Sequence, residues 1–540
     1  MSRTFTPSQF YTVSLIAGLT LLALIHYYPC DDAYISYRYA LNWAQGKGLV
    51  WNEGERVEGY SNFLWTLLIG VSIKVGIPPE TFISLFGTIS YTILLILIYR
   101  LGLRLFPEER LDALWGVLLT GINHSLWGFA RSGMETVPFA ALVSGFMLGV
   151  VRVEENPNDK GRWLLLGIMI ALLPLLRPDG ALFSLWGIGM AVSILRMRLI
   201  GISVSFRKRA FALLILPVIF IWTIYGGWKW LYYHSLLPNS FHIKVQGLTG
   251  IGFGIYYLYT FALTHFLVPY LLLWALFFRH FTANDLFGKL QVVAGLWLIY
   301  TLVIGGDFME FRFLTPIIPF LNLIFLKIIH RFSHIQRFKT ALSLGILAGA
   351  VHAIWVVLPY GMESAKDLKN HLLSPRENWI GIGKRLGELF GGTDVVISVG
   401  AGGAIPYFSG LKCVDFIGLT DSGLAKVGIP FTRVPGHRLI APVEYLRQRG
   451  VHLIIEPNNY MFDRKTFSAW SQQASWLDLQ YRFYFDLDRP IRGERINEVT
   501  FVGIPIDEEF TLAAWYLQFH REVERKIAEE GWKRVVIRRY

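Results

Sequence analysis

Two adjacent carboxylates, Asp31 and Asp32, stand directly after the first long apolar segment of the chain. Adjacent carboxylates at a membrane boundary are costly unless they are solvated, paired or used in chemistry. One interpretation is a helix N-terminus, where aspartate meets free N–H groups and the positive end of the helix dipole. The other is an acid/base or ion-binding site at the membrane face. Position alone favours the helix start, because aspartate is common there.

Arginine recurs close to the ends of apolar segments, at Arg38, Arg131, Arg177 and Arg312. Interfacial anchoring of long cationic side chains accounts for one or two of them, but it favours the cytoplasmic side. Arginine clusters bind phosphate through paired hydrogen bonds. The pattern leaves two interpretations open, which are anchoring and binding of a lipid-linked phosphate.

Three other patterns carry less specific signals. His234 and His242 share one loop at a spacing that matches no common zinc site, so satisfied or phosphate-facing histidines are favoured. The segment 400–405 resembles a dinucleotide loop but ends in isoleucine, so a tight turn after a strand is favoured. Cys30 and Cys413 fall on the same side in the topology below, where a disulfide could form, but sequence does not establish their proximity.

The composition indicates a membrane protein. The chain has 540 residues, of which 53% are hydrophobic, and its mean hydropathy is +0.43. The apolar residues come in blocks of the length that crosses a bilayer as a helix. The net charge of +12 does not indicate nucleic-acid binding, because the basic residues flank the apolar blocks as the positive-inside rule expects.

Hydropathy and loop charge together predict about eleven transmembrane helices. The short apolar segment Asn62–Gly76 is expected to lie in the interface rather than to cross. The predicted spans are approximately Phe10–Pro29, Thr81–Leu103, Leu111–Phe129, Pro138–Arg152, Trp163–Leu176, Ala181–Leu195, Phe211–Trp230, Phe253–Phe278, Leu290–Ile304, Leu314–Ile329 and Leu342–Leu358.

This topology places the featureless basic loops inside and the unusual polar loops outside. The outer loops hold Asp31 and Asp32, Arg131 and Glu135, Arg177 and Asp179, the segment from His234 to Lys244, and Asp307 with Arg312. Charged residues gathered at one membrane face, close to helix ends, indicate one shared cavity.

The sequence predicts two domains, a transmembrane domain over residues 1–360 and a soluble α/β domain over 361–540, outside the membrane. Buried strands are predicted near 394–399, 451–455 and 501–504, and helices over 444–448 and 508–527. The fold class predicted is therefore an α-helical polytopic membrane protein with a C-terminal soluble α/β domain.

Several motifs together resemble the GT-C glycosyltransferases, and among them the arabinofuranosyltransferase group, which includes enzymes of the mycobacterial cell wall and of pilin. The resemblance covers most of the chain and keeps the order of the motifs. Its motifs here are Asp31–Ser36 with Arg38–Ala40, Gly48–Asn52, Arg56–Asn62, Ser132–Thr136, Arg177–Gly180, Leu237–Ser240 with Lys244, Gly305–Met309 with Arg312 and Pro316, Gly403–Tyr407 and Val414–Leu419.

The resemblance implies transfer of a sugar, with arabinofuranose expected, from a polyprenyl-phosphate donor to an extracytoplasmic glycan or protein acceptor, with inversion. It implies a bacterial plasma-membrane enzyme whose partners are the bilayer and these two substrates, and no nucleic acid. A general base is needed because a hydroxyl is a poor nucleophile. Asp31 is the expected base and Asp32 the alternate. The donor phosphate is expected at Arg131, Arg177, Lys244 and Arg312.

Further residues are expected to contact sugar or acceptor: Tyr34, Arg38, Glu58, Glu135, Asp179, His234, Asn239, His242 and Asp307. Glu135 and Asp307 are alternatively expected to bind an ion, so a divalent cation is left open and no metal ligand is assigned. The rival function is a lipid-linked sugar transporter or flippase, in which the same charges would line a pathway. Transporters usually carry repeats and charges at the midplane, whereas these charges gather at one face.

Overall fold

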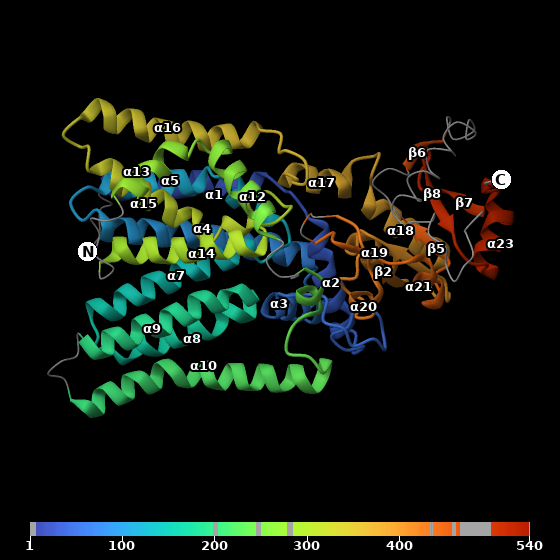
Figure 1. Cartoon of the computed structure of the whole chain (residues 1–540), viewed down its shortest axis with the longest axis horizontal. Helices are drawn as coiled ribbons and strands as arrows, with labels where there is room; N and C mark the ends of the chain where they lie inside the picture. The colour runs from blue at the N-terminus through green and yellow to red at the C-terminus, as the bar shows by residue number, and fades with distance from the viewer. Residues whose placement is uncertain are drawn as a thin grey trace.

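The chain forms a long helical bundle joined to a sheet-containing domain (Figure 1). The computed structural model describes residues 7–197, 203–244, 250–277, 285–432, 434, 436–455, 461–464 and 498–538. The bundle consists of α1 (Pro7–Ile25), α4 (Pro79–Leu105), α5 (Arg110–Gly121), α6 (His124–Trp127), α7 (Thr136–Glu155), α8 (Lys160–Leu176), α9 (Ala181–Met197), α10 (Val204–Tyr233), α12 (Ile251–Thr264), α13 (Val268–Phe277), α14 (Leu286–Ile304), α15 (Ile318–His330) and α16 (Gln336–Trp355).

Each of the eleven predicted spans falls on one of these helices or on a consecutive pair. Six helices of the described part of the chain are long and apolar enough to cross a membrane, namely α4, α7, α10, α14, α16 and the stretch Pro178–Arg196 that includes α9. A seventh crossing is possible if α12 and α13, bent by 105°, form one broken span. The chain is thus a multi-pass membrane protein, and the predicted count of eleven is not reached.

The difference in count comes from helix length. Among the helices that occupy the other predicted spans, α5 has 12 residues, α15 has 13 and α8 has 17. At 1.5 Å per residue, 12 residues extend about 18 Å, which is less than the roughly 30 Å hydrocarbon core. Hydropathy identifies such segments correctly as apolar helices, but it does not fix where each helix ends. The segment predicted not to cross is α3 (Phe63–Lys74), also of 12 residues.

Four short helices lie where the bundle meets the second domain: α2 (Asp31–Ala44), α3, α11 (Asn239–Lys244) and α17 (Ala365–Leu373). Asp31 and Asp32 occupy the first turn of α2, as the helix-start interpretation predicts. Helix α17 begins with a capping box between Ser364 and Asp367, which satisfies the free N–H groups of its first turn. Helix α2 packs on α3 and also on α19 (Ala404–Ser409) of the second domain, so it connects the two parts of the molecule.

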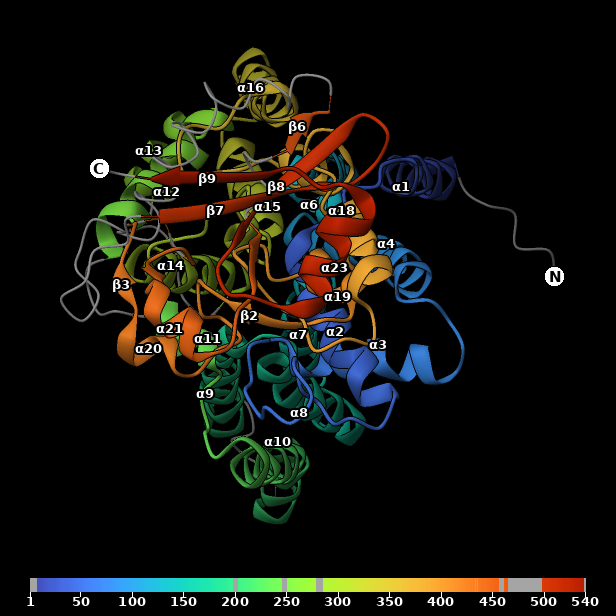
Figure 2. The same ribbon diagram turned by 90° about the vertical axis from the view of Figure 1, so that its right-hand side faces the viewer.

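The C-terminal domain is built on a mixed seven-stranded sheet. Strands β1 (Val396–Val399), β2 (Lys412–Asp415) and β5 (Leu453–Ile455) run parallel, and β8 (Phe510–Tyr516) pairs antiparallel with β5 and β7 (Glu498–Pro505). Figure 2 shows β7, β8 and β9 (Arg534–Arg538) side by side. The remaining elements are β6 (Met461–Asp463), the pair β3 (Ile429–Pro430) and β4 (Leu439–Ile440), and the helices α18 (Trp379–Phe390), α19 (Ala404–Ser409), α20 (Leu424–Val427), α21 (Val443–Gln448) and α23 (Arg521–Glu530).

The predicted strands near 394–399, 451–455 and 501–504 correspond to β1, β5 and β7, and the helix over 444–448 corresponds to α21. The helix predicted over 508–527 is wrong in its first half, which forms β8. The residues from Thr511 to Trp515 are all buried, and a short continuous apolar run does not distinguish a buried strand from a helix. The boundary at residues 360/361 falls between α16 and α17, and as a domain boundary it stays a prediction.

Candidate active site

The carboxylate of Asp31 is bound by the backbone of the C-terminal domain. Its Oδ1 accepts a hydrogen bond from the amide of Ala404 at 2.7 Å, and its Oδ2 accepts one from the amide of Gly403 at 3.0 Å. These amides open α19, so the carboxylate caps that helix in addition to starting α2. A Cβ at position 403 would lie 1.9 Å from the carbonyl oxygen of Asp31, so only glycine permits this approach. Burial raises the pKa of Asp31 to about 7, although the two amides oppose the shift.

The carboxylate of Asp32 is oriented differently and lies beside an arginine. Its side chain is 26% exposed, and its Oδ2 is 3.9 Å from Nη1 of Arg312. Arg312 is itself held by Asp307, at 2.6 Å from Nε to Oδ2. Asp32 therefore keeps an accessible oxygen next to the buried guanidinium of Arg312, and Asp307 holds that guanidinium in place.

A second buried arginine lies close to the first. Arg177 pairs with Asp179 at 2.9 Å and with Glu135 at 3.3 Å. The guanidinium groups of Arg177 and Arg312 lie 4.9 and 5.8 Å from the ring centroid of Phe313. The motifs around 135, 177 and 307–312 thus converge at one end of the bundle. Arg177 and Arg312 do not line the cavity described next, so one cavity shared by all these motifs stays a prediction.

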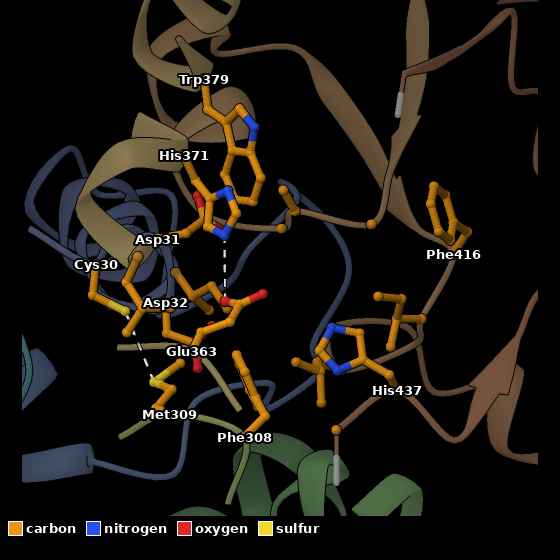
Figure 3. A pocket seen from close by; sticks show the side chains of 18 of the residues that line it. Cys30, Asp31, Asp32, Phe308, Met309, Glu363, His371, Trp379, Phe416 and His437 are labelled. Carbon is orange, nitrogen blue, oxygen red and sulfur yellow. Dashed lines mark hydrogen bonds and ion pairs between the residues drawn. The ribbon is translucent and has the colours of Figure 1, made fainter. Parts of the chain in front are cut away.

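A cavity of about 150 Å³ lies between α2, the loop after α14, α17 and the C-terminal domain (Figure 3). Asp31 and Asp32 line it from the membrane side, together with Cys30, Ile35, Phe308 and Met309. The opposite wall is formed by residues 363–440, which the sequence did not indicate as site residues: Glu363, Leu368, His371, Trp379, Gly400, Ala401, Gly402, Phe416, Ile417, Leu419, Phe431, Gly436, His437 and Ile440.

His371 is a cationic group of this opposite wall, which also contains the carboxylate of Glu363. Its ring stacks on Trp379 with centroids 4.8 Å apart and planes 11° apart, and it pairs with Glu363 at 3.3 Å and with Glu377. Burial lowers its pKa, but the two glutamates outweigh this and raise the pKa to about 10. His371 is therefore protonated at neutral pH, and it contributes to the field around Asp31. Figure 3 shows its ring between Trp379 and Glu363.

Two residues expected to contact sugar, Arg38 and Tyr34, pack at the interface with the C-terminal domain, and their contact with sugar stays a prediction. Arg38 donates to the carbonyl oxygens of Trp51 at 2.7 Å and Leu411 at 2.6 Å, and also to that of Pro406. Tyr34 packs its ring against Tyr407 and is buried. Neither residue lines the cavity.

Four further predicted residues, Glu58, Asn239, His234 and Arg131, also lie away from the cavity. Glu58 pairs with Lys229 at 2.7 Å, and Asn239 donates to the carbonyl oxygens of Gly418 and Leu419. His234 ends α10 in the left-handed conformation at φ 55°. Arg131 donates to Ser84 Oγ at 2.7 Å and to the carbonyl oxygen of Leu24. The side chains of His242 and Lys244 lie outside the described residues, so their predicted roles are not located.

The predicted turn after β1 is confirmed, because residues 400–403 connect that strand to α19. The sequence predicts this loop but not the carboxylate that its amides bind, which belongs to Asp31, 372 residues before Gly403. Cys30 and Cys413 are both free and buried, so the disulfide left open does not form. Cys30 Sγ instead lies 3.9 Å from the sulfur of Met309.

One group of three potential metal ligands lies elsewhere in the described part of the chain, at Glu109, Asp112 and His330. Lys339 lies 3.2 Å from Asp112 and 3.5 Å from Glu109. An ammonium group at this position already supplies the positive charge that a metal would bring. This group therefore does not locate the divalent cation that the sequence left open.

Comparison with known proteins identifies the fold. Residues 376–499 match a family described as a domain of unknown function (DUF8728), and no curated protein matches the chain by sequence. ArnT from Cupriavidus metallidurans is similar in structure, with a TM-score of 0.51 when bound to undecaprenyl phosphate and 0.53 in the apo state. In both cases the identity is 10%, and the match covers 94% of this chain and 98% of ArnT.

The arabinosyltransferase EmbB from Mycobacterium smegmatis is also found, with a TM-score of 0.38, 12% identity, and coverage of 85% of this chain and 45% of EmbB. At 10% identity, the match to ArnT establishes a shared fold over nearly the whole chain. The helical multi-span part and the C-terminal α/β domain both belong to that fold.

Proposed function

We propose that this protein is a GT-C-type membrane glycosyltransferase that transfers a sugar from a polyprenyl-phosphate donor to a glycan or protein acceptor, with inversion. The observation that carries the proposal is a carboxylate, Asp32, that faces a cavity and lies 3.9 Å from a buried arginine, in a chain with the fold of ArnT. The ArnT structure bound to undecaprenyl phosphate supports a lipid-phosphate donor. The sequence motifs support arabinofuranose as the sugar.

Asp32 is the better candidate for the general base, although Asp31 was the first expectation from sequence. Both oxygens of Asp31 already accept backbone hydrogen bonds, which favours a positioning role. Asp32 takes the proton of the acceptor hydroxyl as that oxygen bonds to the anomeric carbon. The bond from that carbon to the phosphate oxygen breaks, and the lipid phosphate leaves with the electron pair. Arg312 lies where it stabilises the charge that develops on the phosphate.

The charge balance of the site bears on donor binding. Counted as ionised, Asp32, Asp307, Glu135 and Asp179 give four negative charges, and Arg177 and Arg312 give two positive ones, which leaves an excess of two negative charges. Binding a phosphate here needs compensation by bound protons or by a divalent cation. Assays with EDTA, and with Mg²⁺ or Mn²⁺ added back, distinguish the two.

The function is tested with the purified full-length chain and a panel of polyprenyl-phosphate sugars, with mass spectrometry of the products. We expect transfer from one donor, with arabinofuranosyl phosphate first in the panel, and the opposite anomeric configuration in the product. Donor translocation across proteoliposomes without any glycosylated product would favour the rival flippase. Failure with every donor, by a folded protein, would refute the proposal.

We further propose that the cavity and the C-terminal domain lie outside the cytoplasm of a bacterial cell, on the basis of the loop charges. Single cysteines at Ser203 and Ser422 test this, because both positions are exposed. The native Cys30 and Cys413 are buried and give little background labelling. The two positions should label from opposite sides of intact vesicles, and labelling from the same side would refute this orientation.

A further inference from the structure

A second cavity lies at the end of the bundle opposite to Asp31. It has a volume of about 500 Å³ and is lined by α4, α7 and α8, which lie side by side (Figure 1). Its apolar wall includes Leu97, Leu148, Leu165 and Met169. Leu165 is 45% exposed, so the cavity opens sideways on the bundle surface, where lipid surrounds a membrane protein. We call it the basal groove.

Two glycines of α7 keep the basal groove open. A Cβ added to Gly145 would lie 3.6 Å from Leu97, and one added to Gly149 would lie 3.6 Å from the sulfur of Met169. Both glycines line the groove, and any larger side chain there would point into it. The groove is thus a space between three packed helices rather than a gap at a loop.

The rim of the groove is rich in arginine. It contains Arg104, Arg152 and Arg162, with Glu155 and Asp159 as the acidic residues. Arg104 pairs with Glu155 at 2.7 Å, and Arg162 pairs with Asp159 at 3.1 Å. These pairs use both acidic groups, and Arg152 forms no ion pair within the described part of the chain. A guanidinium without an ion pair among the described residues therefore stands at the boundary between an apolar groove and a charged rim.

We propose that the basal groove binds an anionic phospholipid, with its phosphate at Arg152 and an acyl chain along the apolar wall. A cation above an apolar groove complements a molecule with a phosphate at one end and a hydrocarbon chain at the other. Basic pockets between transmembrane helices on the cytoplasmic side are suited to anionic headgroups. A free phosphate ion would leave the apolar wall unused. This site is distinct from the proposed active site, and its occupancy does not depend on any transferase activity.

The test is lipid retention by the full-length protein in native mass spectrometry, after incubation with equal amounts of phosphatidylglycerol and phosphatidylcholine. We expect the wild type to retain phosphatidylglycerol preferentially. Arg152→Gln should reduce that retention about tenfold, as expected for loss of one charge-assisted hydrogen bond, and Arg152→Lys should keep most of it. Arg337→Gln is the matched control, because it removes a charge from α16 at the same end of the bundle without touching the groove.

Three outcomes would overturn the proposal. These are equal retention of the two lipids by the wild type, an equal loss in Arg337→Gln, and complete displacement of the lipid by inorganic phosphate, which would indicate a simple anion site. Arg152 is only half-buried and unpaired, so its substitution should not impair folding. Arg104→Gln provides a second variant at the rim, which should reduce retention by a smaller factor.

Discussion

The two ends of the helix bundle both gather arginines, but they hold them in opposite ways. At the end that meets the C-terminal domain, Arg177 and Arg312 are 8% and 5% exposed, and carboxylates fix both. At the other end, the side chain of Arg104 is 29% exposed and Arg152 has no ion pair among the described residues. Buried pairs give fixed charge positions at a high desolvation cost, which suits chemistry. Partly exposed arginines give adaptable charge, which suits contact with lipid.

Among the substitutions considered, Asp32→Asn should have the largest effect, which is a loss of turnover. It keeps the shape of the side chain and removes the base beside Arg312, so turnover should fall by about 10²- to 10⁴-fold. Donor binding should persist, because the two buried arginines are unchanged. The measurement is the single-turnover rate together with donor affinity for the wild type, Asp32→Asn and Asp31→Asn. Loss of turnover in Asp31→Asn alone, with that variant folded, would return the base to the position first expected from the sequence.

Arg177→Ala tests whether buried ion pairs stabilise the end of the bundle that meets the C-terminal domain. The substitution leaves Glu135 and Asp179 buried without their cation, and breaking a buried pair in this way typically costs about 3–5 kcal/mol. The expected result is a large drop in melting temperature in detergent, with partial recovery in Arg177→Lys because lysine restores charge but not the bidentate geometry. A melting temperature unchanged from the wild type would show that Arg177 is solvated rather than structurally paired.

These buried pairs show what sequence could and could not predict. Hydropathy located the helical segments of the bundle, because apolar side chains are needed whether a helix faces lipid or protein. It did not give the lengths of α5 and α15, since tertiary packing decides where those helices end. Phe510–Tyr516 was assigned to a helix because a strand buried on both faces has no alternation to reveal it.

The candidate site was predictable only on its membrane side. Asp31, Asp32, Arg177 and Arg312 stand out because charge near apolar segments is costly. The opposite wall gave no such signal, because His371 and Trp379 lie in ordinary soluble sequence. The structural use of Arg38 was also hidden, since its carbonyl partners near Pro406 and Leu411 lie more than 360 residues away.

Asp31→Asn should change how stability depends on pH. The expected effect lies between those of Arg177→Ala and Arg104→Gln. Burial holds the pKa of Asp31 at about 7 in the folded protein, above its ordinary value of 3.8. The folded state therefore binds the proton more tightly than the unfolded state. This contribution to stability is complete below about pH 4 and is lost as the pH rises through about 7.

The asparagine variant lacks this titration. The stability of the wild type relative to Asp31→Asn should therefore fall by about 1–3 kcal/mol between about pH 5 and pH 8. Melting temperatures of the two proteins across that range provide the measurement. Burial also raises the pKa of Glu58 to about 7 and that of Asp415 to about 6, but both groups are present in both proteins and cancel. Parallel curves would show that Asp31 is already ionised throughout this range.

Arg104→Gln should have the smallest effect on stability and so completes the comparison. Arg104 pairs with Glu155 at 2.7 Å, but the two side chains are 29% and 43% exposed. An exposed pair of this kind is worth about 0.2–1 kcal/mol, because water screens the charges and ordering two long side chains costs entropy. The melting temperature should fall only slightly, and raising the salt concentration should reduce the difference further. A loss as large as that of Arg177→Ala, insensitive to salt, would mean that the two ends of the bundle use arginine in the same way.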